Sequence, residues 1–166
     1  MSLRTLARRA GFSASFLSQL ENGQVSPSIG SLERIANELQ LSLSDLFEAT
    51  QPPVPAVVRA DRRPGFNSKW SRGRVESLIH RDINRTFDAV VVTLKPRGTS
   101  GGHPTTRSAD QFVYVLGGVL KLFLGDDVVE LRKGDAVVVP GRIPHRWENA
   151  GRVAAQALLV STRLAN

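Results

Sequence analysis

The sequence contains no cysteine, which excludes disulfide bonds and thiolate metal sites. Aromatic residues make up only 6% of the chain, with a single tyrosine. No apolar run approaches the roughly 20 residues that a bilayer-spanning helix requires, and the first residues lack the charged-then-apolar order of a secretion signal. We therefore expect a cytoplasmic, globular protein with no membrane partner.

Positive charge is unevenly spread along the 166 residues, whose formal net charge is +7. Residues 1–51 hold four arginines against five acidic side chains, whereas residues 52–85 hold eight basic side chains against three acidic ones. The basic segment is consistent with a surface that binds a phosphate-bearing partner and with an ordinary solvated surface. Position in the sequence does not decide between these two interpretations.

A proline-rich run, Gln51-Pro52-Pro53-Val54-Pro55, separates two kinds of periodicity. It forbids helix and favours a short extended spacer. We predict an all-α domain over residues 1–50, a linker over 51–65 and an all-β domain over 66–166. The expected fold class is thus a multi-domain α + β protein.

The first domain shows four helical segments with clear start and stop signals. Ser2 and Ser13 are candidate N-caps, and Gly11 ends the first helix. The predicted helices are 3–10, 14–21, 28–39 and 44–47.

The second of these helices has one polar face. Leu17 and Leu20 fall on its inner side, whereas small polar residues and Gln19 lie outside. A face of this kind fits the major groove, and glutamine offers both a donor and an acceptor for adenine. Gln19 is therefore the strongest candidate for reading a base.

The segments LARRAGFSASFLSQLENG (6–23) and PSIGSLERIANELQLSLSDLF (27–47) resemble the helix-turn-helix of Cro and phage repressors, the XRE family. The resemblance implies base contacts from Ala14, Ser15 and Gln19, and phosphate contacts from Ser13, Ser18 and Asn22. Family members carry another helix before the position of Ser2. We therefore expect an N-terminally truncated domain, whose inner apolar side chains are incompletely covered.

The second domain alternates apolar and polar residues with a period of two, separated by glycine turns. This pattern predicts a sandwich or barrel. The predicted strands are 57–58, 75–79, 87–94, 111–116, 119–124, 128–131, 136–139 and 153–160.

Two stretches, GTSGGHPTTRSADQFVYVLGG (98–118) and GDAVVVPGRIPHRWEN (134–149), resemble the two motifs of the cupin jelly-roll barrel. In metal-binding cupins these motifs supply three histidines and a glutamate. Here Thr105 and Gln111 occupy two of those places, so His103, Gln111 and His145 are weak metal candidates and we expect no metal cofactor. Two alternatives stay open, a filled barrel with hydrogen-bonded histidines and an organic ligand pocket formed by His103, Thr105, Gln111, His145 and Trp147.

Together the two resemblances imply a sequence-specific DNA-binding transcriptional regulator, by default a repressor, that reads an operator as a homodimer and binds a small-molecule effector in its cupin domain. We expect no enzyme activity. Two other classes remain open: a truncated docking or dimerisation protein that does not bind DNA, and a metal-dependent cupin enzyme.

Overall fold

The computed structural model describes residues 1–46, 57–79 and 86–162. Its helices are α1 (Leu3–Ala10), α2 (Ala14–Glu21) and α3 (Ile29–Glu38), with short 3-10 turns at Ser44–Leu46 and Ala60–Arg62. Among the described residues, no helix has the length and apolar character to cross a membrane. The strands are β1 (Gly65–Ser68), β2 (Gly73–Ser77), β3 (Phe87–Leu94), β4 (Gln111–Gly117), β5 (Val119–Leu124), β6 (Asp127–Arg132), β7 (Ala136–Val139), β8 (His145–Asn149) and β9 (Ala155–Thr162).

Serine caps fix the helix starts, as the sequence predicts. The hydroxyls of Ser2, Ser13 and Ser28 each accept the backbone N–H three residues on, at 3.0–3.2 Å. The predicted fourth helix is wrong, because Ser44–Leu46 forms only a 3-10 turn. Asp45 and Ser42 bond each other's backbone N–H there and hold a tight turn; Phe47 lies outside the described residues.

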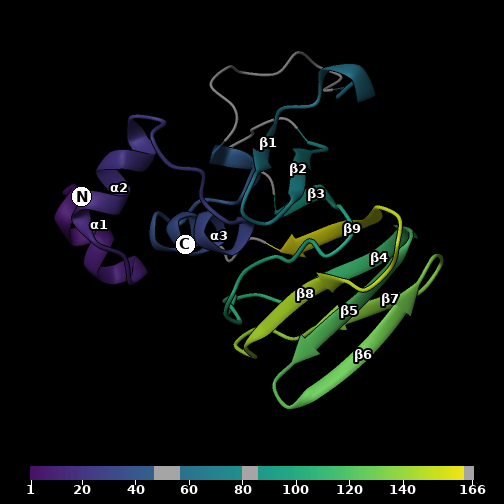
Figure 1. Ribbon diagram of the computed structural model, residues 1–166. Helices are drawn as coiled ribbons and strands as arrows, with labels where there is room; N and C mark the ends of the chain where they lie inside the picture. The colour runs from purple at the N-terminus through teal and green to yellow at the C-terminus, as the bar shows by residue number, and fades with distance from the viewer. Residues whose placement is uncertain (47–56, 80–85, 163–166) are drawn as a thin grey trace.

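The strands form two facing antiparallel sheets (Figure 1). The larger has the order β1-β2-β3-β9-β4-β7 and the smaller β6-β5-β8. The predicted fold class, a helical part followed by a β part, is confirmed. Two strands without apolar alternation, β1 and β8, were not predicted. The predicted strand 57–58 is wrong, since these two residues are not in strand conformation.

The segment predicted as a linker lies partly outside the described residues. Within it, Ala60–Arg62 forms a 3-10 turn, and its last residue, Gly65, already begins β1. There Gly65 pairs with Glu76 of β2. The β part therefore incorporates the end of this segment.

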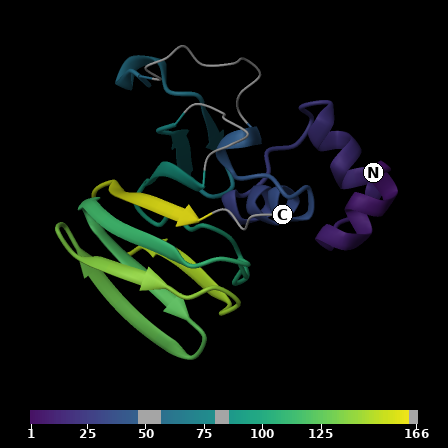
Figure 2. The same ribbon diagram turned by 180° about the vertical axis from the view of Figure 1, so that it is seen from behind.

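Helix α3 belongs to both parts of the protein. Ile29 and Leu32 are 2% and 8% exposed and join the barrel core together with Leu43. Ile35 of the same helix instead packs with Ala7, Ala10 and Leu17 of α1 and α2. Figures 1 and 2 show α1 and α2 standing away from the barrel, with α3 between. Helix α3 thus links the apolar cluster of α1 and α2 to the barrel core.

Close backbone approach makes this docking possible. The Gly30 N–H donates to Ser100 O at 2.9 Å. A Cβ added at Gly30 would lie 3.0 Å from Thr105 Cγ2 and 3.3 Å from Ser100 O, which is tighter than ordinary contact. Glycine therefore lets α3 lie directly on the loop that carries the first cupin motif.

Candidate functional site

The turn between α1 and α2 sets the direction of α2. Gly11 adopts a φ of 70°, a left-handed conformation that costs glycine little. The Phe12 N–H donates to Ala7 O at 2.8 Å. Arg34 of α3 donates to the carbonyl oxygens of Ala10 and Gly11. Because both neighbouring helices hold this turn, α2 has a fixed orientation on the helical part.

Helix α2 presents a polar face to solvent and buries Leu17, which is 3% exposed. Of the predicted DNA contacts, four are exposed and two, Ala14 and Ser18, are half-buried; the exposed ones are Ser13, Ser15, Gln19 and Asn22. Some of these predicted contact residues already form hydrogen bonds within the helix and its cap. The Ser13 hydroxyl caps the helix, and Asn22 Nδ2 donates to Ser18 O at 2.8 Å. Ser15 and Gln19, one turn apart, form the centre of the exposed face.

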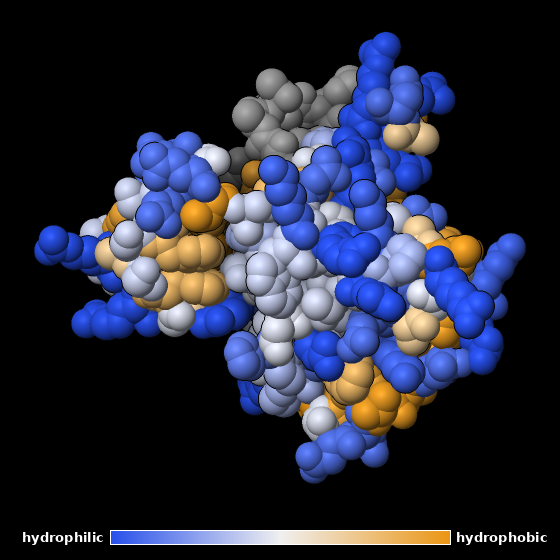
Figure 3. All heavy atoms as spheres, in the orientation of Figure 1, coloured by the Kyte–Doolittle hydropathy of each residue, from blue (hydrophilic) through white to orange (hydrophobic). Residues whose placement is uncertain are grey.

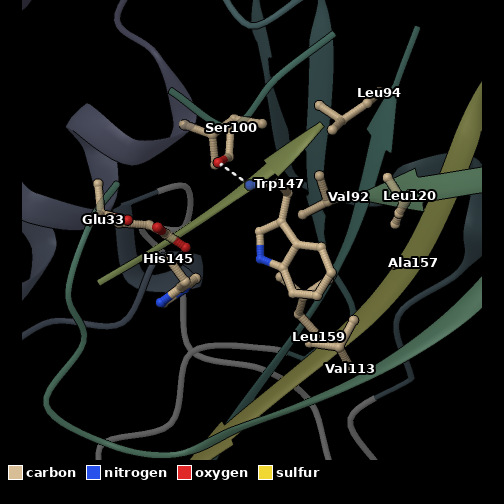
Figure 4. A pocket seen from close by; sticks show the side chains of 12 residues that line it. Glu33, Val92, Leu94, Ser100, Val113, Leu120, His145, Trp147, Ala157 and Leu159 are labelled. Atoms are coloured by element: carbon tan, nitrogen blue, oxygen red, sulfur yellow. Dashed lines mark hydrogen bonds between the residues drawn. The ribbon is translucent and has the colours of Figure 1, made fainter. Parts of the chain in front are cut away.

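The two sheets enclose a small cavity whose wall includes α3 (Figure 4). The volume open to the centre of a water molecule is about 20 Å³, enough for a water molecule. Aliphatic side chains form most of the wall, and the polar lining residues are Glu33, Ser100, Thr105, His145 and Trp147. A ligand larger than water therefore requires the wall to open.

The structure brings most of the predicted ligand residues together but separates one. Thr105, His145 and Trp147 line the cavity, and Gln111 is buried on the same inward face of β4 as Val113. His103 is exposed and lines a separate cleft of about 320 Å³ between the helices and the barrel. The segment around Thr105 forms only an isolated β-bridge and not a strand. The period-two alternation of a strand therefore does not extend to His103.

Two of the predicted ligand residues carry a buried polar atom that has no hydrogen-bond partner among the described residues. These atoms are Trp147 Nε1, a donor, and Gln111 Oε1, an acceptor. Figure 4 shows the indole nitrogen on the side of the ring that faces His145. His145 itself is 3% exposed, with Nδ1 3.1 Å from Ile143 O. A polar ligand can satisfy groups that are otherwise costly to bury.

An ion pair that sequence reasoning missed joins α3 to the barrel. Glu33 Oε1 accepts from Arg107 Nη1 at 2.8 Å, and the two side chains are only 9% and 12% exposed. Arg107 Nη2 also donates to Ser161 Oγ of β9 at 3.3 Å. One signal in the sequence could have indicated this pair. Glu33 directly follows Leu32 on the apolar stripe of a helix, and a carboxylate on such a stripe needs a partner.

The residues present do not fit a tightly held metal ion. The cupin resemblance implies a set of three histidines and a glutamate, but His103 points outside the cavity, and Thr105 and Gln111 are weak neutral donors. Among the described residues, no group of three histidine, cysteine or acidic side chains is placed to bind one ion.

A fixed helix-turn-helix docked on an antiparallel barrel with an enclosed cavity defines a DNA-binding regulator with a cupin domain. Family models support both halves: a helix-turn-helix model matches residues 1–46 and a cupin domain model matches residues 90–161. The chain therefore combines an XRE-type helix-turn-helix domain with a cupin domain, and this prediction from the sequence is confirmed.

The chain is similar to known regulators along most of its length. It is 29% identical to the HTH-type transcriptional regulator PuuR of Escherichia coli (strain K12), over 90% of this chain and 80% of that protein. An HTH_3 family transcriptional regulator from Vibrio cholerae has the same fold, with a TM-score of 0.75 at 21% identity, over 99% of this chain and 88% of that one. The fold is also found in an enzyme, hydroxypropylphosphonic acid epoxidase from S. wedmorenis (TM-score 0.56, 21% identity, 97% and 89% coverage).

Removal of one partner of the buried pair should destabilise the protein strongly. We expect Glu33→Ala to lower the free energy of unfolding by about 3 kcal/mol, because Arg107 keeps a desolvated charge, and the double variant Glu33→Ala/Arg107→Ala to lose less than the two single changes combined. Urea unfolding measures both. The control is Arg9→Ala, which breaks the exposed pair with Glu38 at the same 2.8 Å separation and should cost less than about 1 kcal/mol. Equal losses from the two pairs would contradict the structural role of Glu33.

Proposed function

We propose that ligand binding inside the barrel controls DNA binding by changing how α3 sits on the barrel. The observation that carries this proposal is the position of Glu33: its carboxylate belongs to the helix-turn-helix domain, yet it lines the cupin cavity and pairs with Arg107. A ligand shifts an equilibrium only through its different affinity for the two states. Here the docked state offers a narrow, water-sized cavity, so a larger ligand favours the undocked one.

DNA reading is assigned to the exposed face of α2. Gln19 and Ser15 lie on adjacent turns of the helix, with no bulky side chain between them on that face. Glutamine recognises adenine through two hydrogen bonds in the major groove. The Ser13 and Asn22 groups lie at the two ends of the helix, where phosphate contacts fix the position of a recognition helix.

The effector is proposed to be a small molecule with both a hydrogen-bond acceptor and a donor. The acceptor would receive the Trp147 indole N–H, and the donor would reach towards Gln111 Oε1, which is buried on the same face of β4 as the lining residue Val113. The cavity walls otherwise consist of aliphatic side chains such as Val113 and Leu159, which favour a compact ligand with an apolar body.

We further propose a homodimer formed through the outer face of the larger sheet. Phe112, Tyr114 and Leu116 of β4 and Val138 of β7 are 38–56% exposed there. Phe112 stands opposite Val138 and Val160 in the sheet, so these side chains form one continuous apolar patch. Patches of this kind mark interaction surfaces. A second copy is the fitting occupant, because two half-sites one helical turn apart require two recognition helices.

Repression is the proposed mode of action, because a dimer seated on an operator blocks access to it without any further contact. Binding to the chromosome of a bacterium would place the protein in the cytoplasm. We also propose that it is not an enzyme, since its metal-ligand set is incomplete by donor chemistry. The alternative of a docking protein without DNA affinity is an outcome of the first experiment below.

The first experiment measures binding to duplex DNA from upstream of the protein's own gene. We expect salt-dependent, sequence-selective binding, and Gln19→Ala should reduce the preference over a scrambled duplex about tenfold, since a bidentate base contact is worth about 1–3 kcal/mol. Glu21→Ala is the control: it lies on the same helix, is exposed, and should strengthen binding to both duplexes alike. A folded protein without salt-dependent DNA affinity would instead identify a docking module.

Ligand entry can be followed through Trp147, because the chain has only two tryptophans. In a Trp70→Phe background, Trp147 is the only tryptophan, and it is 7% exposed in the cavity. Titration with small organic acids, amino acids and amines should identify a ligand that changes its emission and weakens DNA binding over the same concentration range. A ligand that changes emission and leaves DNA affinity intact would show that the cavity is not coupled to DNA binding.

The dimer surface is tested by a matched pair of substitutions. Val138 and Val128 are both valines with 56% exposure, but Val138 lies in the apolar patch and Val128 on β6 of the other sheet. We expect Val138→Glu to shift the protein towards monomer in analytical ultracentrifugation, because it puts a charge into an apolar interface. Val128→Glu should leave the oligomeric state unchanged, and the same state for both variants would rule out this surface.

A further inference from the structure

The helical part has few cations with which to hold DNA. Residues 1–46 carry four arginines and four acidic side chains. Arg9 is paired with Glu38, and Arg34 donates to backbone carbonyls and lies over the Phe12 ring, 4.4 Å from its centre. Contacts of basic side chains with phosphates supply much of the affinity for DNA. Further positive charge on the surface next to α2 would therefore add to the affinity for DNA.

Two turns of the cupin domain lie next to the loop that follows α2. The turn between β1 and β2 is bonded to this loop at three points: Ser68 Oγ donates to Pro27 O at 2.7 Å, the Lys69 N–H donates to Ser26 Oγ at 3.3 Å, and the Ile29 N–H donates to Ser71 Oγ at 3.2 Å. The loop after α2 and the cupin turn, over 40 residues apart in sequence, thus form one surface.

The turn after β3 extends this surface. The Lys95 N–H donates to Arg72 O at 2.8 Å, and the Thr99 N–H donates to Ser71 O at 3.0 Å. The two turns, 69–72 and 95–98, are therefore held side by side. We call them the basic turns, since they contain the four exposed cations Lys69, Arg72, Lys95 and Arg97 and no acidic residue. None of these four forms a salt bridge with another described residue.

Backbone conformation gives a second, independent observation. Arg72 and Arg97 have φ values of 49° and 61°, a region that glycine occupies readily and other residues occupy at a cost. They are two of the four non-glycine residues in this region among those described, with Gln40 and Arg142. Strained residues of this kind gather at functional positions, and here the strain is accepted at two arginines on one small surface. Figure 3 shows apolar patches both on the protruding α1 and α2 and on the barrel, with many hydrophilic side chains on the surface between them.

We propose that the basic turns of the cupin domain bind the DNA backbone beside the bases that α2 reads. The proposal rests on the DNA-binding function of the helix-turn-helix domain. It makes the cupin domain part of the DNA interface for as long as α3 is docked. Trp70, 54% exposed between Lys69 and Ser71, adds a flat apolar surface to the same turn.

The test is the salt dependence of binding to the upstream duplex and to a scrambled duplex. Arg72→Gly/Arg97→Gly removes two cations and places glycine where φ is positive, so the fold should be retained. We expect the slope of log affinity against log salt concentration to fall by about two, which corresponds to a difference of about twelvefold in the affinity loss between 0.2 M and 0.05 M salt. Both duplexes should be affected equally, in contrast to Gln19→Ala.

Arg142→Gly is the matched control, because Arg142 has a φ of 67° in the turn between β7 and β8, outside the basic turns. It should leave the slope unchanged. Lys69→Gln/Lys95→Gln checks the same surface without altering residues of positive φ and should lower the slope in the same way. A wild-type slope in both double variants, with unchanged thermal unfolding, would overturn the role of the basic turns while leaving the regulator intact. If the wild-type protein itself showed no salt-dependent binding, both the role of the basic turns and the proposed regulator function would be overturned.

Discussion

The docking of α3 on the barrel is the contact on which the rest of the structure depends. One face of this short helix contributes Ile29 and Leu32 to the barrel core, and the other holds α1 and α2 through Ile35. Such a helix cannot move on the barrel without disturbing one apolar cluster or the other, because close-packed cores tolerate discrete arrangements better than gradual deformation. The geometry therefore links the position of the DNA-reading helix to the state of the barrel.

The ion pair at this contact suits the proposed switch better than a permanent junction. An apolar seam would be the more stable way to join the two parts, since a buried ion pair recovers little of its desolvation cost. The pair of Glu33 and Arg107 instead places a charge at the wall of a cavity that is also lined by Trp147, whose indole nitrogen has no partner among the described residues. A ligand that competes for these groups acts directly on the docking of α3, with no need for a long pathway between sites.

The same docking brings positive charge next to the loop that follows α2. Without the barrel, the helix-turn-helix residues have no net charge to offer a phosphate backbone. With it, the basic turns continue the surface of the loop after α2. The proposal thus divides base recognition and backbone attraction between two parts of the chain, with the docking of α3 between them. This arrangement lets one movement weaken both the position of the recognition helix and the electrostatic attraction.

Local chemistry in the sequence determined most of the secondary structure. Serine caps, Gly11 and apolar periodicity gave α1, α2 and α3 almost to the residue, and alternation gave the long strands such as β3 and β5. Alternation did not predict β8, whose buried positions are His145, Trp147 and Asn149. Its polar inward residues hide the alternation of apolar and polar residues. Nor did local chemistry place His103 outside the cavity or join Glu33 to Arg107, since 74 residues separate that pair in sequence. Capping and periodicity act within a few residues, whereas the wall of the cavity and the charged surface beside α2 exist only once distant segments pack together.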